Sequence, residues 1–456
     1  MSRVIIAGAG AVGVTIAKYL TQAGSEVTLI DRSEALVNQL AESIDVRSVI
    51  GHCALPETLD KAGASDADMV IAVTRSDEVN MIICQVAKSL FDVPVKIARI
   101  RNQHFLHQRY IRLFNDDNIP IDYIISPEQE IAASITERLR VPGAQETLIL
   151  ADGRVHVQGV RCRQDCPIIN TPLRHLTGVF PNLAIEILSI TRDGILSVPS
   201  GDDEMIAGDH VYFTVPASHI GRAMAVFGYE EETPSRITVV GGGTIGSGLA
   251  RRLNKSFEDL TVTLIEHNAA RAKEIAVANP SLVVIHGNAL DHETLQESEP
   301  KTCNALIAVT ENDETNVLAC LLARRAGVHH TMALSNKDTY SMLLPDLAVD
   351  SLISPMEITV SSILRLVRRG HIRQALAVLD GRAEILDANL PEGSGWIDVR
   401  LGDADMPDNV RIGAIIREND IIIGRPDVVM RANDRVILFA SRASLPEVEA
   451  ALAGQS

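Results

Sequence analysis

The chain has 456 residues, 46% of them hydrophobic and 3% aromatic, and a formal net charge of −17. This length exceeds what one hydrophobic core supports, so several domains are expected. The strong negative charge argues against nucleic acid as a partner, because phosphate binding needs a basic surface.

Other features of composition restrict the cellular setting. The six cysteines are scattered and form no disulfide framework, which fits a reducing compartment. The N-terminus enters a strand after a single Arg and leaves no room for a signal peptide. No run reaches the roughly 18 apolar residues that a membrane-spanning helix needs. We therefore expect a cytoplasmic protein whose contact with a membrane is peripheral.

The chain opens with a β-branched run that leads into a glycine-rich turn. Residues 4–7 precede Gly8, Gly10 and Gly13, and apolar residues then recur at helical spacing. In a Gly-x-Gly-x-x-Gly turn the glycines permit the bend, the approach of a pyrophosphate and the packing of the helix. The helix N-terminus offers free N–H groups to the phosphates.

The next strand, residues 27–30, ends at an acidic residue, Asp31. A carboxylate at this position accepts hydrogen bonds from both ribose hydroxyls and repels a 2′-phosphate. The segment therefore favours NAD or an adenosine nucleotide over NADP.

Strands and helices alternate after Asp31. Strands are expected near residues 46–50, 69–73, 95–99 and 123–125, and Ser126-Pro127 is a good start for a helix through Leu139. Such alternation predicts a parallel, doubly wound sheet.

A second copy of this pattern begins near residue 236. Its turn contains Gly241, Gly243 and Gly246, and its second strand ends at Glu266. Three phrases also recur in the same order, since residues 49–59, 72–80 and 124–128 are echoed by residues 286–295, 308–316 and 352–356. The chain is therefore an internal duplication.

Each copy is followed by short apolar runs with many turn residues, typical of a small β-rich module. The fold class expected is α/β, with two Rossmann-like parallel-sheet units that are each followed by a small α+β module. The expected domains are residues 1–139, 140–228, 236–369 and 370–456, with an acidic linker at 229–235.

This organisation resembles the family that regulates conductance of potassium, the RCK or KTN domain family. The resemblance covers essentially the whole chain, in a double-length form without a membrane segment. It implies a homotetrameric cytosolic ring attached to the cytoplasmic face of a bacterial inner membrane, under an integral-membrane potassium channel subunit. It also implies that NAD or NADH, and ATP or ADP, bind the Rossmann-like units and gate potassium uptake.

The resemblance also assigns binding residues. The first site would comprise Gly8, Ala9, Gly10, Ala11, Val12 and Gly13 at the phosphates, Asp31 at the ribose, and His52, Thr74, Arg75 and Arg99. The second would comprise Gly241, Gly242, Gly243, Thr244, Ile245, Gly246, Glu266, Asn288, Thr310 and Glu311. His52 departs from the family pattern, in which Asp or Asn is commoner.

The two sites are expected to differ. Arg99 and Arg101 are answered in the second copy by Ala333 and Ser335, which removes two guanidiniums able to bind phosphate. We therefore expect the first site to suit a phosphate-rich ligand better than the second.

No catalytic or metal-binding set emerges from the sequence. Cys162 and Cys166 lack partners at zinc spacing, and His104 and His107, expected on a helix, have no carboxylate on their face. An NAD-dependent dehydrogenase would need a general acid or base beside the nicotinamide, and the small modules offer none. A nucleotide-binding regulator is favoured, and the sequence leaves open a sensor whose partner is not a channel.

Two groups of residues allow more than one interpretation. Four arginines stand at the end of the helix that starts at Pro355, at positions 365, 368, 369 and 373. They could simply complement the negative end of the helix dipole, or they could contact a channel. The apolar faces of the helices that start at Pro127 and Pro355 could cover their own sheet or form an interface between halves or subunits.

Overall fold

A computed structural model describes residues 2–22, 24–37, 46–141, 143–180, 183–229, 234–336, 349–367, 372–379 and 381–452. Residues 230–233 of the expected linker and residues 368 and 369 of the arginine group lie outside these ranges. The chain divides into two compact units, residues 1–131 with 355–367 and residues 132–354 with 368–456.

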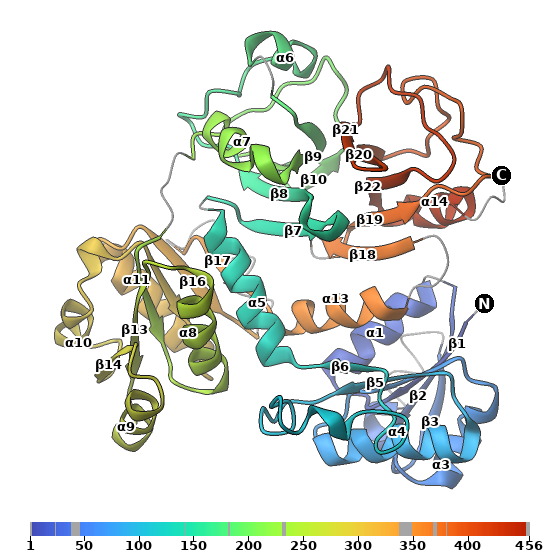
Figure 1. The fold of residues 1–456 in the computed structure, drawn as a ribbon, viewed down its shortest axis with the longest axis vertical. Coiled ribbons are helices and arrows are strands. Elements are labelled where there is room, and N and C mark those ends of the chain that lie inside the picture. Colours follow the sequence, from blue (N-terminus) through green and yellow to red (C-terminus); the bar gives the residue numbers. More distant parts are fainter. Residues whose placement is uncertain are drawn as a thin grey trace. The chain divides into compact units, whose positions relative to one another are not determined.

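The first unit contains a six-stranded parallel sheet in the order β3-β2-β1-β4-β5-β6, the Rossmann order (Figure 1). Its strands are β1 (Arg3–Ala7), β2 (Glu26–Asp31), β3 (Arg47–Ile50), β4 (Met69–Ala72), β5 (Val95–Arg99) and β6 (Tyr123–Ile125). The helices between them include α1 (Ala11–Gln22), α3 (Pro56–Lys61) and α4 (Asp77–Phe91), and α5 (Pro127–Arg140) follows β6.

Alternate residues of these strands supply a hydrophobic core on each face of the sheet. Ile6 packs with α1 residues on one face, whereas its neighbour Ile5 packs with α4 residues on the other. Because successive strand residues point to opposite faces, the β-branched runs in the sequence are buried on both sides.

The second unit repeats this sheet in the order β14-β13-β12-β15-β16-β17. Its strands are β12 (Arg236–Val240), β13 (Thr261–Glu266), β14 (Val283–His286), β15 (Ala305–Ala308), β16 (His330–Leu334) and β17 (Ser351–Ile353). Its helices are α8 (Thr244–Ser256), α9 (Ala269–Ala278), α10 (His292–Glu297) and α11 (Asp313–Ala326). The predicted duplication of the Rossmann unit is confirmed.

One helix packs on the sheet of the other half. Helix α13 (Pro355–Val367) follows the second sheet in the chain but lies beside α1 in the first unit (Figure 1). Its residues Val360, Ile363 and Leu364 are buried in the core of the first sheet. The Ser362 hydroxyl also donates to Glu130 of α5, at 2.8 Å. The apolar face of α13 is therefore an interface between the two halves of the chain.

The C-terminal half of α5 belongs to the second unit. Arg138 Nη1 donates to Ser351 Oγ of β17 at 2.7 Å, and the Arg140 guanidinium lies 5.7 Å from the centre of the Phe257 ring. Helices α5 and α13 thus each contact the sheet of the other repeat.

The second unit also contains the two small modules, each a five-stranded antiparallel sheet. The first has the order β10-β9-β11-β8-β7, with β7 (Glu146–Leu150), β8 (Val155–Arg161), β9 (Glu186–Arg192), β10 (Ile195–Ser197) and β11 (His210–Pro216). The second has the order β18-β19-β22-β20-β21, with β18 (Ile372–Val378), β19 (Ala383–Asn389), β20 (Val410–Arg417), β21 (Asp420–Ile423) and β22 (Arg435–Ser441).

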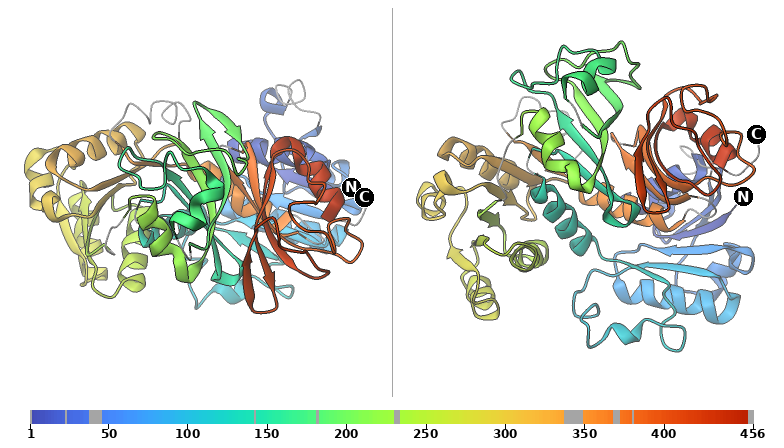
Figure 2. Two further views of the ribbon diagram at one scale, coloured as in Figure 1. Left: turned by 90° about the horizontal axis from the view of Figure 1, so that it is seen from above. Right: turned by 45° about the horizontal axis from the view of Figure 1, so that its top comes forward.

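A bidentate ion pair occupies the same place in each module. Arg192 binds Asp209 with both nitrogen–oxygen distances at 2.8 Å, and Arg417 binds Asp434 at 2.9 and 2.8 Å. The two modules lie side by side and share one hydrophobic core, to which Tyr212 and Phe439 contribute (Figure 2). They approach so closely that a Cβ built on Gly413 would lie 2.0 Å from Thr214 Oγ1.

Two expectations about local chemistry can be compared with the structure. All six cysteines are free and buried, as the absence of a disulfide framework predicted. The prediction that His104 and His107 lie on a helix is wrong, because both residues lie in a segment of turns and bends. The Asn102 side chain accepts from the His104 N–H at 3.0 Å, a local hydrogen bond that competes with helix formation.

A carboxyl group at the contact between the modules has a raised pKa. Burial raises the pKa of Glu186 from 4.5 to about 7, against the opposing effect of Arg411 and Arg425. Arg411 Nη1 lies 3.7 Å from Glu186 Oε1. The folded protein therefore holds this proton more tightly than the unfolded chain, and stability falls as the pH rises from about 4.5 through about 7.

Replacing Glu186 with Gln is expected to remove this loss. The melting temperature of Glu186→Gln should rise relative to the wild type between pH 5 and pH 8, because only the wild type must lose a buried proton. Thermal unfolding across this range measures it. Glu392→Gln, at an exposed position of the second module, is the control and should show a constant difference. A constant difference for Glu186→Gln as well would contradict the assignment.

Candidate functional site

The first glycine turn connects β1 to α1 in a conformation that requires glycine. Gly8 has a φ of +116°, and its N–H donates to the Ile30 carbonyl at 2.9 Å. A Cβ on Gly13 would lie 1.9 Å from the Gly8 carbonyl oxygen, whereas a Cβ on Gly10 would meet no atom within 4 Å. Gly8 and Gly13 therefore build the turn, and Gly10 leaves its outer surface open.

Asp31 lies beside this turn at the end of β2. Its Oδ2 accepts from the Ala9 N–H at 2.7 Å and its Oδ1 accepts from the Ser33 N–H at 2.9 Å. The side chain is half-buried and lines the cavity in front of the turn. Each carboxylate oxygen retains a lone pair for a ligand hydroxyl.

A cavity of about 480 Å³ opens at the carboxyl ends of these strands. It brings together nine residues of the predicted first site, namely Gly8, Gly10, Ala11, Val12, Asp31, His52, Thr74, Arg75 and Arg99. Ala9 and Gly13 are buried behind the turn and do not line it. The cavity lies at the ends of the neighbouring strands β1 and β4, between which the strand order reverses, and ligands bind to open α/β sheets at this position.

Two buried polar residues hold the strand ends that frame the cavity. Asn80 accepts from the Thr74 N–H at 2.9 Å and donates to the Arg99 carbonyl at 2.8 Å. Asp77 accepts from the backbone N–H groups of Arg101 and Asn102 at 3.0 and 2.8 Å. Both residues lie in the repeated segment 72–80, so the sequence marked them, but their role in holding the ends of β4 and β5 was not predicted.

The three arginines near the cavity differ in their contacts. Arg99 Nη2 donates to the Thr74 carbonyl at 2.8 Å, and its buried Nε has no hydrogen-bond partner within the described chain. Burial, and next the charge of Arg101, lower the pKa of Arg99. Arg75 is exposed at the cavity, whereas Arg101 pairs with Glu128 at 3.2 Å and is not part of the lining. Arg75 and Arg99 are thus the two of these three guanidiniums that belong to the cavity lining.

The cavity also has lining residues that were not predicted. Arg32, Ser33 and Leu36 follow Asp31 on the side where an adenosine would lie. His52 lines the cavity, but its Nδ1 already accepts from the Ala54 N–H at 3.3 Å.

The second glycine turn repeats the geometry of the first. Gly241 has a φ of +100°, and a Cβ on Gly246 would lie 1.8 Å from its carbonyl oxygen. Asn316 accepts from the Thr310 N–H at 2.8 Å and donates to the Leu334 carbonyl at 2.9 Å, as Asn80 does in the first repeat.

The acidic residue of the second turn is more enclosed than its counterpart. Glu266 is only 2% exposed, and its two oxygens accept from the backbone N–H groups of Gly242 and Asn268 at 2.7 and 2.8 Å. A Cβ on Gly242 would lie 2.5 Å from Ile275 Cδ1, so the Ile275 side chain packs against the second glycine turn. Asn288 is exposed and caps a local turn through Leu290.

The structural register corrects the predicted correspondence between the two sites. Strand pairing aligns Ala98 with Ala333, and the equivalent bonds from Asn80 and Asn316 align Arg99 with Leu334. Arg101 corresponds to Asn336, since each donates its backbone N–H to the equivalent Asp. The assignment of Ala333 and Ser335 to these positions was shifted by one residue. The loss of both guanidiniums in the second repeat remains.

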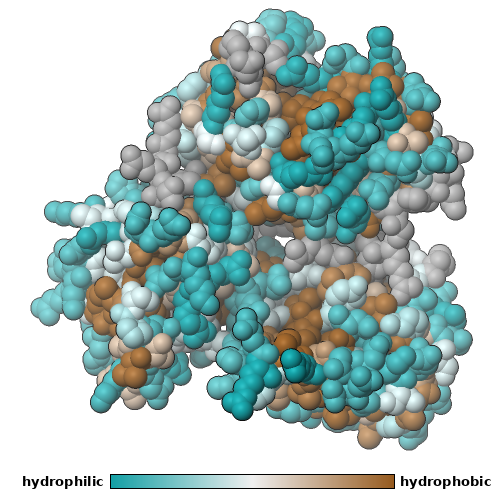
Figure 3. All heavy atoms as spheres, in the orientation of Figure 1, coloured by the Kyte–Doolittle hydropathy of each residue, from teal (hydrophilic) through white to brown (hydrophobic). Residues whose placement is uncertain are grey.

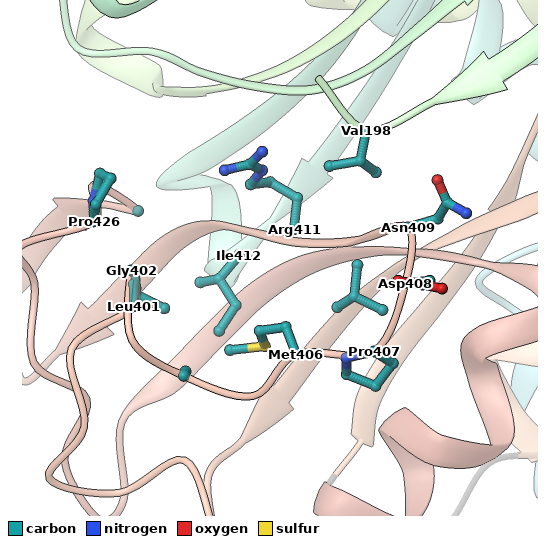
Figure 4. A pocket seen from close by; sticks show the side chains of 13 residues that line it. Val198, Leu401, Gly402, Met406, Pro407, Asp408, Asn409, Arg411, Ile412 and Pro426 are labelled. Atoms are coloured by element: carbon teal, nitrogen blue, oxygen red, sulfur yellow. The ribbon is translucent and has the colours of Figure 1, made fainter. Parts of the chain in front are cut away.

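A second cavity, of about 470 Å³, lies in the second unit where the small modules meet (Figure 4). Leu401, Met406, Ile412 and Pro426 of the second module line it together with Val198 of the first. Arg411 points between Val198 and Pro426 in this view. Figure 3 shows that hydrophilic residues cover most of the molecular face it displays, with hydrophobic residues in smaller patches.

The described residues contain no group of three or more His, Cys, Asp or Glu arranged to hold a metal ion. Nor does any helix within the described ranges combine the length and the apolar character that a membrane span requires.

Two Rossmann units with intact glycine turns and an acid at the end of the second strand define a class of nucleotide-binding proteins. Comparison with known proteins identifies the family. The TrkA-N domain family matches residues 4–127 and 237–355, and the TrkA-C domain family matches residues 385–453. The chain belongs to the TrkA family of Trk-system potassium uptake proteins.

Full-length relatives support this assignment. The Trk system potassium uptake protein TrkA of Azorhizobium caulinodans is 40% identical over 447 residues, which cover 98% of each chain. The protein of the same name from Haemophilus influenzae is 34% identical over 452 residues, again 98% of each chain. None of these names describes a catalysed reaction.

Solved structures agree on the fold. The RCK domain of GsuK superposes with a TM-score of 0.59 at 18% identity, covering 99% of this chain and 95% of that one. The GsuK channel bound to NAD gives a TM-score of 0.60 at 17% identity and covers 99% of this chain and 79% of that one. The RCK-type fold expected from the sequence is therefore confirmed.

Proposed function

We propose that this protein is the cytoplasmic, non-enzymatic regulatory subunit of a Trk potassium-uptake system and that nucleotides in its Rossmann clefts gate the membrane subunit. The partner would be an integral-membrane potassium channel subunit of the TrkH or TrkG type. The protein would act as a homotetramer at the cytoplasmic face of the bacterial inner membrane. The 40% identity to a TrkA protein, over 98% of the chain, supports a role in a Trk system. The first cleft supports control by nucleotides.

The open glycine turn carries the nucleotide part of this proposal. Gly10 presents free backbone at the N-terminus of α1, with Asp31 on one side and the guanidiniums of Arg75 and Arg99 on the other. This arrangement suits NAD, NADH, ATP or ADP, which combine a ribose with two or more phosphates. The predicted residues of both clefts are proposed as the binding residues on the same grounds.

Binding would act on the relative positions of the strand ends. A ligand that contacts Asp31 at the end of β2, Arg75 after β4 and Arg99 at the end of β5 favours whichever conformation holds these groups at the right separation. A difference of a few kcal/mol in affinity between two conformations is enough to redistribute them. The membrane subunit would sense that redistribution.

An oxidoreductase would need an acid–base group beside the nicotinamide. Among the described residues that line the first cavity, His52 is the one histidine, and its Nδ1 already accepts a backbone hydrogen bond. No observation favours this alternative.

The proposal is tested by potassium flux into proteoliposomes that contain the membrane subunit and this protein, in ATP, ADP, NAD⁺ or NADH. Flux should depend on which nucleotide is present, and NADH should not be oxidised with small carbonyl compounds. Nucleotide binding without any change in flux would contradict the gating role. Turnover of NADH would favour the oxidoreductase.

Asp31→Asn is expected to weaken NADH binding at the first cleft by about tenfold and to reduce the discrimination against NADPH. The change removes the charge that orders the ribose hydroxyls and repels a 2′-phosphate. Calorimetry with both cofactors measures the effect. Asp68→Asn is a matched control, because this carboxylate also accepts a backbone N–H, from Arg3 at 2.8 Å, but at the opposite end of the same sheet. Unchanged discrimination in Asp31→Asn would contradict the assigned role.

A further inference from the structure

The site in front of the second glycine turn, called the second cleft below, differs from the first cleft most on the side of the sheet beyond β15, the counterpart of β4. In the first cleft this side carries Arg75, Arg99 and, next to it, Arg101. The structural register places Glu311, Leu334 and Asn336 at the corresponding positions. Three cationic positions thus become one anionic and two uncharged positions.

The side that would hold adenosine differs much less. Each site has an acid there, Asp31 or Glu266, which is followed directly by Arg32 in the first repeat and by His267 in the second. His267 Nδ1 lies 3.1 Å from Glu266 Oε1. Both oxygens of Glu266 accept a backbone N–H, as those of Asp31 do. Glu266 is only 2% exposed, however, so it offers a ligand less than the half-buried Asp31 does. Selectivity in the second cleft therefore falls to the exposed Glu311.

The strand order of the second sheet indicates which part of a bound ligand would lie next to Glu311. The sheet order reverses between β12 and β15, and a dinucleotide lies across that point. With adenosine beside Glu266 at the end of β13, the pyrophosphate lies at the turn of Gly241 to Gly246, and the remainder extends over β15. In ATP that remainder is a phosphate tail, and in NAD it is the nicotinamide riboside.

Charge then separates the ligands. A carboxylate repels a phosphate tail, attracts the positively charged ring of NAD⁺ and gains nothing from the neutral ring of NADH. The guanidiniums of Arg75 and Arg99 have the opposite preference, because they bind phosphate oxygens and repel a cationic ring.

We propose that the second cleft selects NAD⁺ over NADH and over ATP or ADP, whereas the first cleft selects the polyphosphate nucleotides. This inference rests on the proposed function in that both clefts bind nucleotides. One chain would then respond to adenylate phosphorylation through its first repeat and to the oxidation state of the NAD pool through its second.

The test uses the full-length protein with its first cleft saturated by ATP, into which NAD⁺ or NADH is titrated by calorimetry. The wild type should bind one ATP per chain and then NAD⁺ about tenfold more tightly than NADH, a difference expected from one partly exposed charge. Glu311→Gln should bring the two affinities together. Glu311→Arg should reverse the preference and add a second ATP per chain.

Matched control variants distinguish the effect of a charge within a cleft from the effect of a change in the overall charge of the protein. Glu258→Gln lies at the opposite, amino-terminal end of the second sheet, just before β13, and should leave the NAD⁺ preference unchanged. In the first repeat, Arg75→Glu should weaken ATP binding about tenfold, and Lys18→Glu on the exposed surface of α1 should not.

The outcomes distinguish this inference from the function on which it rests. Two equivalent ATP molecules per wild-type chain, equal affinities for NAD⁺ and NADH, or no NAD⁺ binding after one ATP would each overturn the inference and leave the proposed function intact. Binding of no nucleotide by any cleft would overturn both.

Discussion

Gly10→Ala is expected to weaken nucleotide binding at the first cleft by between about tenfold and a hundredfold without loss of stability. A Cβ at Gly10 meets no protein atom within 4 Å, so the folded chain accommodates it. The same methyl group occupies the surface on which a pyrophosphate must approach the backbone. Each hydrogen bond lost to a charged group costs about 1.5–3 kcal/mol, and 1.4 kcal/mol corresponds to a factor of ten.

Calorimetric titration with ATP and thermal unfolding together check this prediction. Gly13→Ala is the contrasting variant, because its Cβ would lie 1.9 Å from the Gly8 carbonyl oxygen and must distort the turn. It should lower the melting temperature as well as the affinity. Gly243→Ala, whose Cβ is also unobstructed, should leave ATP binding at the first cleft unchanged. Wild-type ATP affinity in Gly10→Ala would show that the ligand does not contact this turn.

The second large effect is expected at the contact between the small modules. Asp387→Ala should reduce the free energy of unfolding of the second unit by about 3–5 kcal/mol, because it leaves a buried guanidinium without its partner. Asp387 is fully buried, and its two oxygens bind Arg435 Nε and Nη2, both at 2.7 Å. Asp387 also accepts from the Ala151 N–H of the first module at 3.2 Å.

Urea unfolding, followed by a probe in the small modules, measures this loss. Arg435 Nη1 also binds Asp152 at 2.6 Å, but the Asp152 side chain is 73% exposed. Asp152→Ala is therefore the control and should destabilise the second unit far less than Asp387→Ala does. Replacing Asp387 and Arg435 together by apolar residues should restore much of the stability, since the desolvation of the pair is then avoided. A loss below 1 kcal/mol in Asp387→Ala would show that the pair contributes little to module packing.

Much of the fold could be predicted because its signals are local. The Gly8, Gly10 and Gly13 spacing is needed by one turn, and the acid at the end of the next strand contacts that same turn. The repeated phrase that contains Asp77 and Asn80 has an equally local reason, since both residues fix the ends of β4 and β5. The residues of the first cleft therefore followed from motif and topology together.

The mistakes arose where counting along the chain replaced spatial register. Arg99 and Arg101 were matched to Ala333 and Ser335, although the pairing of β15 with β16 makes Leu334 and Asn336 their counterparts. The strand order fixes which carbonyl Asn316 reaches, and no property of residues 333–336 by themselves reveals it.

The sequence by itself determined the duplication, the parallel sheets, the two glycine turns and the charge difference between the residues near them. Only the tertiary structure decided which sheet α13 covers, that the small modules share a core, and that Glu266 is enclosed while Asp31 remains accessible. The physical reason is that an apolar helix face predicts that the helix will be buried but does not indicate which surface will cover it. Turn geometry and strand periodicity depend on neighbouring residues, whereas burial depends on which distant surfaces meet.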